Sequence, residues 1–491
     1  MSNTVEDVNT LISRETLAGR LPVPGSARLY NSFGILLGAF IAIGAASFNY
    51  LFGASLAYIG NTQLAIAGWL LGLMLALGPI YLASGMISFK HGVDPVDAVK
   101  SSFGTRGSTL MLVMLLASTI GWSFVLVAMT GQAAGRLYQI LFNPSGEVSN
   151  NIIALACIVM LSLIWLLLRK GPAMIPALTR ITSPAVLIIA AVLLFLITRN
   201  VDFLTLLSTN VDSSESFTTD PLLQLAYGVE FGVSNALTIV PFFGGIARLI
   251  RKRSHLITPG LVGSGLLGAG CISAIGALAA IATGSTEPAE WVLKSAGNGF
   301  GCIIVVLLLL ANVGTLISFI YLAGVSVQQI RFFAKLRWDI IILVLLLPGL
   351  LVAFNTSSLI DRVMTLLAYN GAIFAGIAGV MFSDYILLRR QRILPAHLFV
   401  KDSEGAYWFW GGVNWVAFAV VLIATGAYLS LFNPMTLEVS GLFRYIGAGM
   451  PAFAVAIISY YVLMRLVISS STAGGYNNID ILAKKKVIVG L

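Results

Sequence analysis

One carboxylate near the middle of a long apolar segment is the first residue that could do chemistry. The segment reads LLQLAYGVEFGVSNALTIVPFFGG, residues 222–245, and Glu230 lies close to its centre. Charged groups are costly in hydrocarbon, so they rarely persist there without a partner or a purpose. Ser234 and Asn235 follow four and five residues later. Glu230 could carry a proton, accept N–H hydrogen bonds or balance a positive charge, and the two polar neighbours could hydrogen-bond the same ligand. The alternative is structural: a protonated Glu230 bonded to a neighbouring helix, with Ser234 and Asn235 in interhelical hydrogen bonds.

A second candidate site is a pair of hydroxyls in the segment ANVGTLISFIYLAG. Thr315 and Ser318 are three residues apart, so on a helix they share one face. Hard cations such as Na+ prefer oxygen ligands, and carbonyl groups near Ala45 and Ala46 could complete such a site. The alternative is that each hydroxyl bonds back to a carbonyl of its own helix.

Composition shows what kind of protein must position these residues. Of 491 residues, 58% are hydrophobic and 10% are charged, and the mean hydropathy is +0.94. Soluble domains contain about a quarter charged residues, so the chain is expected to be an all-α membrane protein with many spans. The N-terminus lacks a basic head followed by an apolar core, so no cleaved signal peptide is expected. Cys157, Cys271 and Cys302 have no paired spacing and are expected to be reduced packing residues.

Apolar runs of spanning length predict about twelve transmembrane helices. They fall at residues 33–59, 64–89, 109–135, 151–168, 181–198, 222–246, 257–282, 300–328, 338–355, 361–386, 409–432 and 442–467.

The basic residues predict the orientation of these helices. With the N-terminus inside, 24 Lys and Arg residues fall on the inner side and 5 on the outer side. This distribution follows the positive-inside rule, so both termini are expected in the cytoplasm and the protein in the cell membrane. The net charge of +9 is thus explained by topology, and no nucleic-acid partner is expected. With this arrangement Glu230 is the one acidic residue placed mid-membrane, and no Lys or Arg lies there to pair with it.

Two spans contain residues that weaken a helix. The first carries GAASFN, residues 44–49, with Ser47 and Asn49 among small residues. The sixth carries glycines around Glu230 and Pro241 beyond it. Broken helices at corresponding positions of two halves indicate a midplane binding site, and spans one and six are five apart, as a five-plus-five inverted repeat requires. Close helix packing by small residues is the alternative.

Several segments resemble nucleobase–cation symporter family 1, in its cytosine and purine permease branch. GVDPVDAVKSSFGTRGS (92–108) is similar to the family's loop between spans two and three. FSDYILLRR (382–390) and YWFWGGVNWVAF (407–418) resemble the end of span ten and the start of span eleven. STIGWSFVLVAMTGQA resembles span three, where the family carries a tryptophan that stacks on substrate, here Trp122. The resemblance implies the leucine-transporter fold and cation-driven uptake of nucleobases, hydantoins or related heterocycles.

This chain also departs from the family pattern at positions that bind substrate. The acidic residue of the family's Pro-Asp-x-x-Arg run is absent from PFFGGIAR, although Pro241 and Arg248 remain. Thr315 fits the family's Ser-Thr-Asn cluster, whereas Leu316 replaces its amide, and Leu126 stands where the family often has another amide. Several of the family's hydrogen-bonding groups for a planar heterocycle are therefore missing from this chain.

These observations predict a secondary transporter that couples a nucleobase-like or related small nitrogenous substrate to Na+ or H+ by alternating access. An amino-acid or amine carrier is the alternative if Glu230 binds a charged amine. A channel or a membrane enzyme is a remote alternative, because the spans show isolated polar sites and no Walker loop or HExxH helix. No cofactor and no obligatory protein partner are expected besides the substrate and the lipid bilayer. The expected substrate-binding residues are Trp122, Glu230, Ser234, Asn235, Ser47, Asn49 and Ser318, and the expected cation-binding residues are Ala45, Ala46, Thr315 and Ser318.

The predicted organisation is an N-terminal tail at residues 1–30 and a ten-helix core at 31–400. Two additional helices follow at 401–470, and a C-terminal tail at 471–491 completes the chain.

Overall fold

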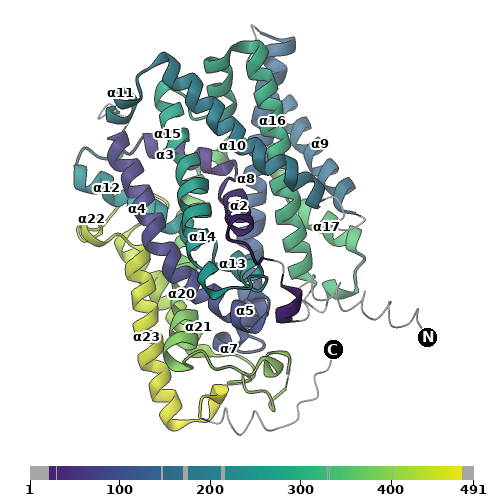
Figure 1. Cartoon of the computed structure of the whole chain (residues 1–491), viewed down its shortest axis with the longest axis vertical. Helices are drawn as coiled ribbons and strands as arrows, with labels where there is room; N and C mark the ends of the chain where they lie inside the picture. Colours follow the sequence, from purple (N-terminus) through teal and green to yellow (C-terminus); the bar gives the residue numbers. More distant parts are fainter. Residues whose placement is uncertain are drawn as a thin grey trace.

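The computed structural model is a bundle of helices (Figure 1). It describes residues 22–28, 30–144, 147–169, 175–211, 216–328, 330, 332–400 and 402–477. Within these residues no strand occurs, and the β-type pairing is limited to isolated bridges. The all-α prediction is therefore confirmed. Most of the two predicted tails, residues 1–21 and 478–491, lies outside the described residues.

The described helices match the twelve predicted segments. Seven are long and apolar enough to cross a membrane, and a bent pair makes up an eighth span. Three shorter apolar helices lie at Pro184–Arg199, Trp338–Ala353 and Trp415–Leu431. The remaining predicted span, 33–59, is divided into two helices. In chain order the helices of the spans are α2 (Phe33–Gly44), α3 (Phe48–Ala57), α4 (Thr62–Ile80), η2 (Tyr81–Gly85), α5 (Met86–His91), α8 (Ser108–Phe142), α9 (Asn150–Leu168), α10 (Ile175–Asn200), α12 (Pro221–Leu237), α13 (Val240–Ala247), α14 (Thr258–Gly260), η5 (Leu261–Gly270), α15 (Cys271–Thr283), α16 (Pro288–Val327), α17 (Trp338–Leu346), α18 (Gly349–Ala353), α20 (Val363–Phe382), η7 (Ser383–Leu388), α21 (Trp415–Leu431) and α23 (Gly449–Ser470).

Short helices fill the connections between these spans. They are α6 (Pro95–Ala98), α7 (Lys100–Phe103), α11 (Phe203–Ser208), α19 (Thr356–Asp361) and α22 (Phe443–Ile446). In Figure 1, α11 lies at one end of the long axis and α7 near the other.

The first span is broken where the sequence predicts it. Helix α2 ends at Gly44 and α3 begins at Phe48, so Ala45, Ala46 and Ser47 lie between them. Gly44 approaches the next layer closely, because a Cβ on it would lie 2.4 Å from the carbonyl oxygen of Ser264 in η5. The break and the close approach therefore occur at the same residue.

The break in the sixth span lies farther along the chain than predicted. Helix α12 is regular through Asn235 and ends at Leu237, and α13 begins at Val240 after a bend of 48°. Pro241 lies in the first turn of α13, where its missing N–H costs no hydrogen bond. Glu230 and Ser234 thus belong to an intact helix, and Asn235 lies within one turn of the break.

The glycines around Glu230 serve close packing instead of a break. A Cβ on Gly232 would lie 2.3 Å from the carbonyl oxygen of Trp69 in α4, and one on Gly228 would lie 2.6 Å from that of Ala65. In α4, Gly72 approaches the backbone of α12 in the same way. Small residues let two helix backbones approach, which is the alternative considered for these positions.

The packing of the spans has an internal symmetry. Span six packs on span two through these glycines, and span one packs on span seven through another set. In the second set, a Cβ on Gly53 of α3 would lie 2.1 Å from the carbonyl oxygen of Ser273 in α15. Spans two and seven also share a π-helical stretch, at η2 and η5. An inverted repeat that relates span one to six and two to seven predicts this pattern.

Candidate functional site

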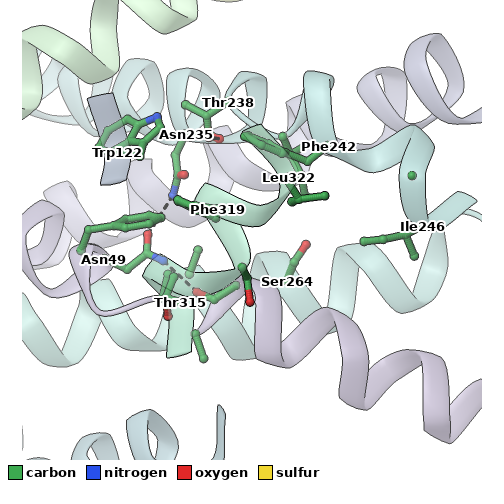
Figure 2. A pocket seen from close by; sticks show the side chains of 18 of the residues that line it. Asn49, Trp122, Asn235, Thr238, Phe242, Ile246, Ser264, Thr315, Phe319 and Leu322 are labelled. Atoms are coloured by element: carbon green, nitrogen blue, oxygen red, sulfur yellow. Dashed lines mark hydrogen bonds between the residues drawn. The ribbon is translucent and has the colours of Figure 1, made fainter. Parts of the chain in front are cut away.

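A cavity of about 440 Å³ lies where the two broken helices meet (Figure 2). Its lining includes the break of span one, the break of span six and the facing surfaces of α8 and α16. The lining also includes Ile246, and Asp94 and Arg248, which follow the helices of spans two and six. The lining residues used below are Gly44, Ala45, Ala46, Phe48, Asn49, Asp94, Trp122, Asn235, Thr238, Phe242, Ile246, Arg248, Ser264, Thr315, Ser318, Phe319 and Ser326.

Two amide side chains join the broken helices across the cavity wall. Asn235 donates from Nδ2 to Oδ1 of Asn49 at 3.2 Å. Asn49 in turn donates from Nδ2 to the carbonyl oxygen of Gly44 at 2.7 Å. The carbonyl freed where α2 ends is therefore satisfied by a side chain, as a buried helix end requires. Thr238, in the break of span six, donates from Oγ1 to the carbonyl oxygen of Asn235 at 2.6 Å.

Four aromatic rings from four different spans form a series along the cavity. The ring centroids of Trp122 and Phe48 are 5.2 Å apart, and those of Phe48 and Phe319 are 6.3 Å apart. Phe319 then stacks on Phe242 of α13 at 5.8 Å with an interplanar angle of 7°. A fifth ring, Phe52, meets Trp122 edge-on at 5.5 Å. These distances are typical of favourable aromatic pairs.

The four expected cation ligands all line this cavity. Ala45 and Ala46 lie in the break of span one, and Thr315 and Ser318 lie on α16. Each hydroxyl bonds to a carbonyl of its own helix: Thr315 to Ala311 at 3.2 Å and Ser318 to Gly314 at 3.0 Å. Both hydroxyls thus bond back to their own helix, which was the alternative to a cation site. Both side chains also line the cavity.

Among the residues that the structure describes, the charged side chains of the lining both follow the helices of the spans. Asp94 accepts a hydrogen bond from the backbone N–H of Val96 at 3.1 Å and caps α6. Burial, followed by repulsion from Asp97, raises the pKa of Asp94 to about 6, and the positive charge of Arg248 opposes this shift. Both charged lining residues therefore lie beyond the helices of their spans, whereas Trp122 lies within α8.

Glu230 and Ser234 lie outside the cavity lining. Oε2 of Glu230 accepts hydrogen bonds from the backbone N–H groups of Ala448 at 2.7 Å and Gly449 at 2.9 Å. Ser234 bonds to Oε1 of Glu230 at 3.1 Å and to the hydroxyl of Tyr428 at 3.3 Å. Besides Ser234, the partners of the carboxylate are main-chain N–H groups at the start of α23, which a search for Lys or Arg does not detect. This geometry gives no support to substrate contact by either side chain.

Ser47 also points away from the cavity. Its hydroxyl hydrogen-bonds to Oδ1 of Asn312 on α16, and Asn312 donates from Nδ2 to Thr130 of α8 at 3.1 Å. This buried chain ties the break of span one to spans eight and three. Of the expected substrate-binding residues, the structure brings Trp122, Asn49, Asn235 and Ser318 together at the cavity, and it places Glu230, Ser234 and Ser47 in the surrounding framework.

Sequence reasoning missed Phe48, Phe242, Phe319 and Thr238. Each aromatic lies in an apolar helix, where a ring is normally read as packing. Their neighbours in the sequence could have identified two of them. Phe48 lies in the segment GAASFN, and Phe319 directly follows Ser318. Thr238 was overlooked because the break was placed too early in span six.

The sequence matches a known family over most of its length. The model of a family of permeases for cytosine/purines, uracil, thiamine and allantoin matches residues 22–463. Over 76 residues, 16% of this chain, it is 41% identical to the hydantoin permease of Microbacterium maritypicum. This second match spans 15% of that permease's length.

Solved structures share the fold. Mhp1, a nucleobase-cation-symport-1 family transporter, in a closed conformation with bromovinylhydantoin bound, aligns with a TM-score of 0.73 at 17% identity, covering 94% of this chain and 98% of Mhp1. The inward-facing conformation of Mhp1 aligns with a TM-score of 0.74 at 18% identity, covering 95% and 97%. A Na+-coupled sialic acid symporter aligns less closely, with a TM-score of 0.58 at 11% identity, covering 92% of each chain.

These alignments confirm the predicted leucine-transporter-like architecture with broken spans one and six. The family resemblance seen in the sequence is confirmed as well, because the matched region includes the first eleven predicted spans and most of the twelfth. The chain therefore belongs to the family of permeases for cytosine/purines, uracil, thiamine and allantoin, which are transporters and not enzymes.

Proposed function

We propose that this protein is a cation-coupled symporter that takes up a neutral, planar nitrogen heterocycle by alternating access. The observation that carries the proposal is the cavity at the two helix breaks, which combines aromatic rings with the amides of Asn49 and Asn235. Aromatic faces and hydrogen-bonding amides are suited to a flat, polar and uncharged ring. Cytosine, purines and uracil among the family's substrates, and the bromovinylhydantoin bound to Mhp1, are neutral nitrogen heterocycles of this kind.

The charges around the cavity favour a neutral substrate over an amine. Along the described lining, formal charge is confined to Asp94 and Arg248, beyond the helices of spans two and six. Glu230, which would have balanced an amine, bonds to the backbone of Ala448 and Gly449. A buried ammonium without a partner would be strongly disfavoured in this cavity.

Purified protein in proteoliposomes tests the proposal directly. We expect saturable counterflow of uracil, allantoin or hydantoin, and stabilisation of the protein against heating by the same compounds. Amines and amino acids should produce neither effect. Counterflow of amines alone would replace the proposed substrate class, and conductance without counterflow would indicate a channel.

We further propose that sodium is the coupling ion and that Thr315 and Ser318, with carbonyls of Ala45 and Ala46, hold it. The support is that these four residues share the cavity wall at the break of span one. Each hydroxyl donates its proton to the carbonyl of Ala311 or Gly314, so its oxygen lone pairs remain available to a bound Na+. Uptake would then follow an inward cation gradient across the cell membrane, with both termini in the cytoplasm.

Reciprocal binding measurements test the sodium site. Sodium should raise substrate affinity, and substrate should raise sodium affinity by the same factor. Thr315→Val keeps the shape of the side chain but loses the oxygen, so it should weaken both. Sodium-independent binding and transport by the unmodified protein would reject the site and favour protons as the coupling ion.

A further inference from the structure

The indole N–H of Trp122 is a buried donor without a partner. Its Nε1 finds no hydrogen-bond acceptor, and the residue is 2% exposed. Trp122 nevertheless lines the cavity, and in Figure 2 its nitrogen lies on the side of the ring turned toward Thr238 and Asn235. An unmet buried donor costs about 1–3 kcal/mol relative to a paired one, so this group favours a ligand that supplies an acceptor.

The ring of Trp122 is already covered by neighbouring aromatics. Phe48 lies against it at 5.2 Å with an interplanar angle of 31°, and Phe52 meets it edge-on. A ligand that stacked on the same face would have to displace Phe48. The edge carrying Nε1 is the part of the side chain that lacks a partner.

The orientation of Asn235 is fixed by a chain of hydrogen bonds. The carbonyl of Gly44 can only accept, so the group of Asn49 that faces it at 2.7 Å must be the NH2. Oδ1 of Asn49 therefore faces Asn235, whose own NH2 must donate at 3.2 Å. This logic leaves Oδ1 of Asn235 as an acceptor on a residue that lines the cavity.

From these contacts we propose that Trp122 and Asn235 together select a lactam or ureide edge, that is, a ring carbonyl next to a ring N–H. Trp122 Nε1 donates to the substrate carbonyl, and Asn235 Oδ1 accepts from the substrate N–H. The inference rests on the proposed uptake of a neutral heterocycle and specifies which edge of it is read. The helix break takes part in specificity, because the carbonyl of Gly44 fixes the orientation of the amides of Asn49 and Asn235.

The experiment measures dissociation constants for uracil and for 1,3-dimethyluracil, which keeps both carbonyls and lacks N–H. Asn235→Leu should weaken uracil by about tenfold, the scale of one hydrogen bond, and leave 1,3-dimethyluracil unchanged. Trp122→Phe should weaken both compounds by the same factor, again about tenfold. Hydantoin and 1,3-dimethylhydantoin provide a second pair with the same logic.

Two further variants test the role of the hydrogen-bond chain and provide a control. Asn49→Leu releases the amide of Asn235 to rotate, so the preference for uracil over its dimethyl derivative should shrink. Asn370→Leu is the matched control: Asn370 lies outside the cavity lining and donates from Nδ2 to the carbonyl oxygen of Leu366, so the preference should be retained. If Trp122→Phe is poorly folded, incorporation of 3-benzothienylalanine at position 122 removes the N–H and keeps the bicyclic ring.

The outcomes separate the inference from the proposed function. Binding of uracil that survives both Trp122→Phe and the benzothienyl variant overturns the inference and leaves the function standing. Equal loss of both compounds in Asn235→Leu also overturns it, because the N–H would not be the group that is read. Failure of the unmodified protein to bind any lactam or ureide of the two pairs overturns the proposed function, and the inference with it.

Discussion

Glu230 illustrates how a buried carboxylate can be held by main-chain N–H groups and a hydroxyl, without a basic side chain. Its Oε2 accepts two N–H groups at the start of α23, and its Oε1 accepts the hydroxyl of Ser234. The first amides of a helix lack partners within the helix and form the positive end of its dipole. The residue therefore joins span six of the core to the last of the two additional helices.

We expect Glu230→Ala to destabilise the protein without removing the binding site. The substitution leaves the N–H groups of Ala448 and Gly449 unpaired in apolar surroundings, at a cost of about 1–3 kcal/mol for each group. Glu230→Gln keeps an acceptor oxygen and should be milder. Melting temperature in detergent checks the stability, and the dissociation constant for substrate checks the site. A normal melting temperature with lost binding would place the carboxylate in the substrate pathway instead.

Asp94 provides a residue-scale prediction about pH. Burial, and then the neighbouring Asp97, raise the pKa of Asp94 to about 6 from its ordinary value of 3.8. Between these values the folded protein keeps a proton that the unfolded chain has lost. Stability therefore falls as the pH rises through this window.

Asp94→Asn should remove this pH dependence and keep the cap of α6, because Asn is an equally good capping residue. Between about pH 5 and about pH 7.5, the protein should lose about 1 kcal/mol of stability that the variant retains. Thermal unfolding of both proteins across this range measures the difference. Parallel curves for the two proteins would show that Asp94 has an ordinary pKa.

At the scale of elements, the contact between α4 and α12 depends on the absence of side chains. A Cβ on Gly72 would lie 2.1 Å from the carbonyl oxygen of Val229, and one on Gly232 would lie 2.3 Å from that of Trp69. Backbone atoms cannot move aside as a flexible side chain can. The two helices would therefore have to separate.

Gly72→Ala and Gly232→Ala should each destabilise the protein by about 1–3 kcal/mol, the usual cost of overpacking. Gly78→Ala is the matched control on α4, because no atom lies within 4 Å of the Cβ that it would add. Thermal unfolding of the three variants tests the difference. Equal stability of Gly232→Ala and Gly78→Ala would show that the interface tolerates separation.

The limits of sequence reasoning are clearest in these elements. Apolar length predicted the twelve segments, and GAASFN marked the first break, because both signals are local. Gly228 and Gly232 were read as marks of a second break, yet their cause is the backbone of α4, which is distant in the sequence. Phe48 and Phe319 look like packing residues until the fold brings four rings into one series. A residue's partner across the fold decides its role, and the sequence does not name that partner.

At the scale of the whole molecule, two packed pairs of spans face a single cavity. Spans one and seven form one pair, spans six and two the other, and both breaks open toward α8 and α16. The glycine contacts at Gly53 and Gly228 lie within helices, away from the breaks, and hold each pair together there. This arrangement suits alternating access, in which one part of the bundle moves against another around a fixed site.

Orientation in the membrane leads to the last prediction. The cavity reaches Arg248 and Ser326, on the side that carries most of the basic residues, whereas α11 lies on the opposite side. In a background with Ala in place of Cys157, Cys271 and Cys302, Ser326→Cys should react with a membrane-impermeant maleimide in inside-out vesicles. Saturating uracil should slow the reaction, because Ser326 lines the cavity that the substrate would fill.

The control for this labelling is the exposed Ser208 at the end of α11. Ser208→Cys should react in intact cells and be protected in inside-out vesicles, the reverse of Ser326→Cys. Reaction of both cysteines from the same side would contradict the orientation that the 24 to 5 distribution of Lys and Arg predicts. Labelling of Ser326→Cys from outside alone would instead mean that this end of the cavity faces the exterior, and that the cytoplasmic assignment of the termini must be reversed.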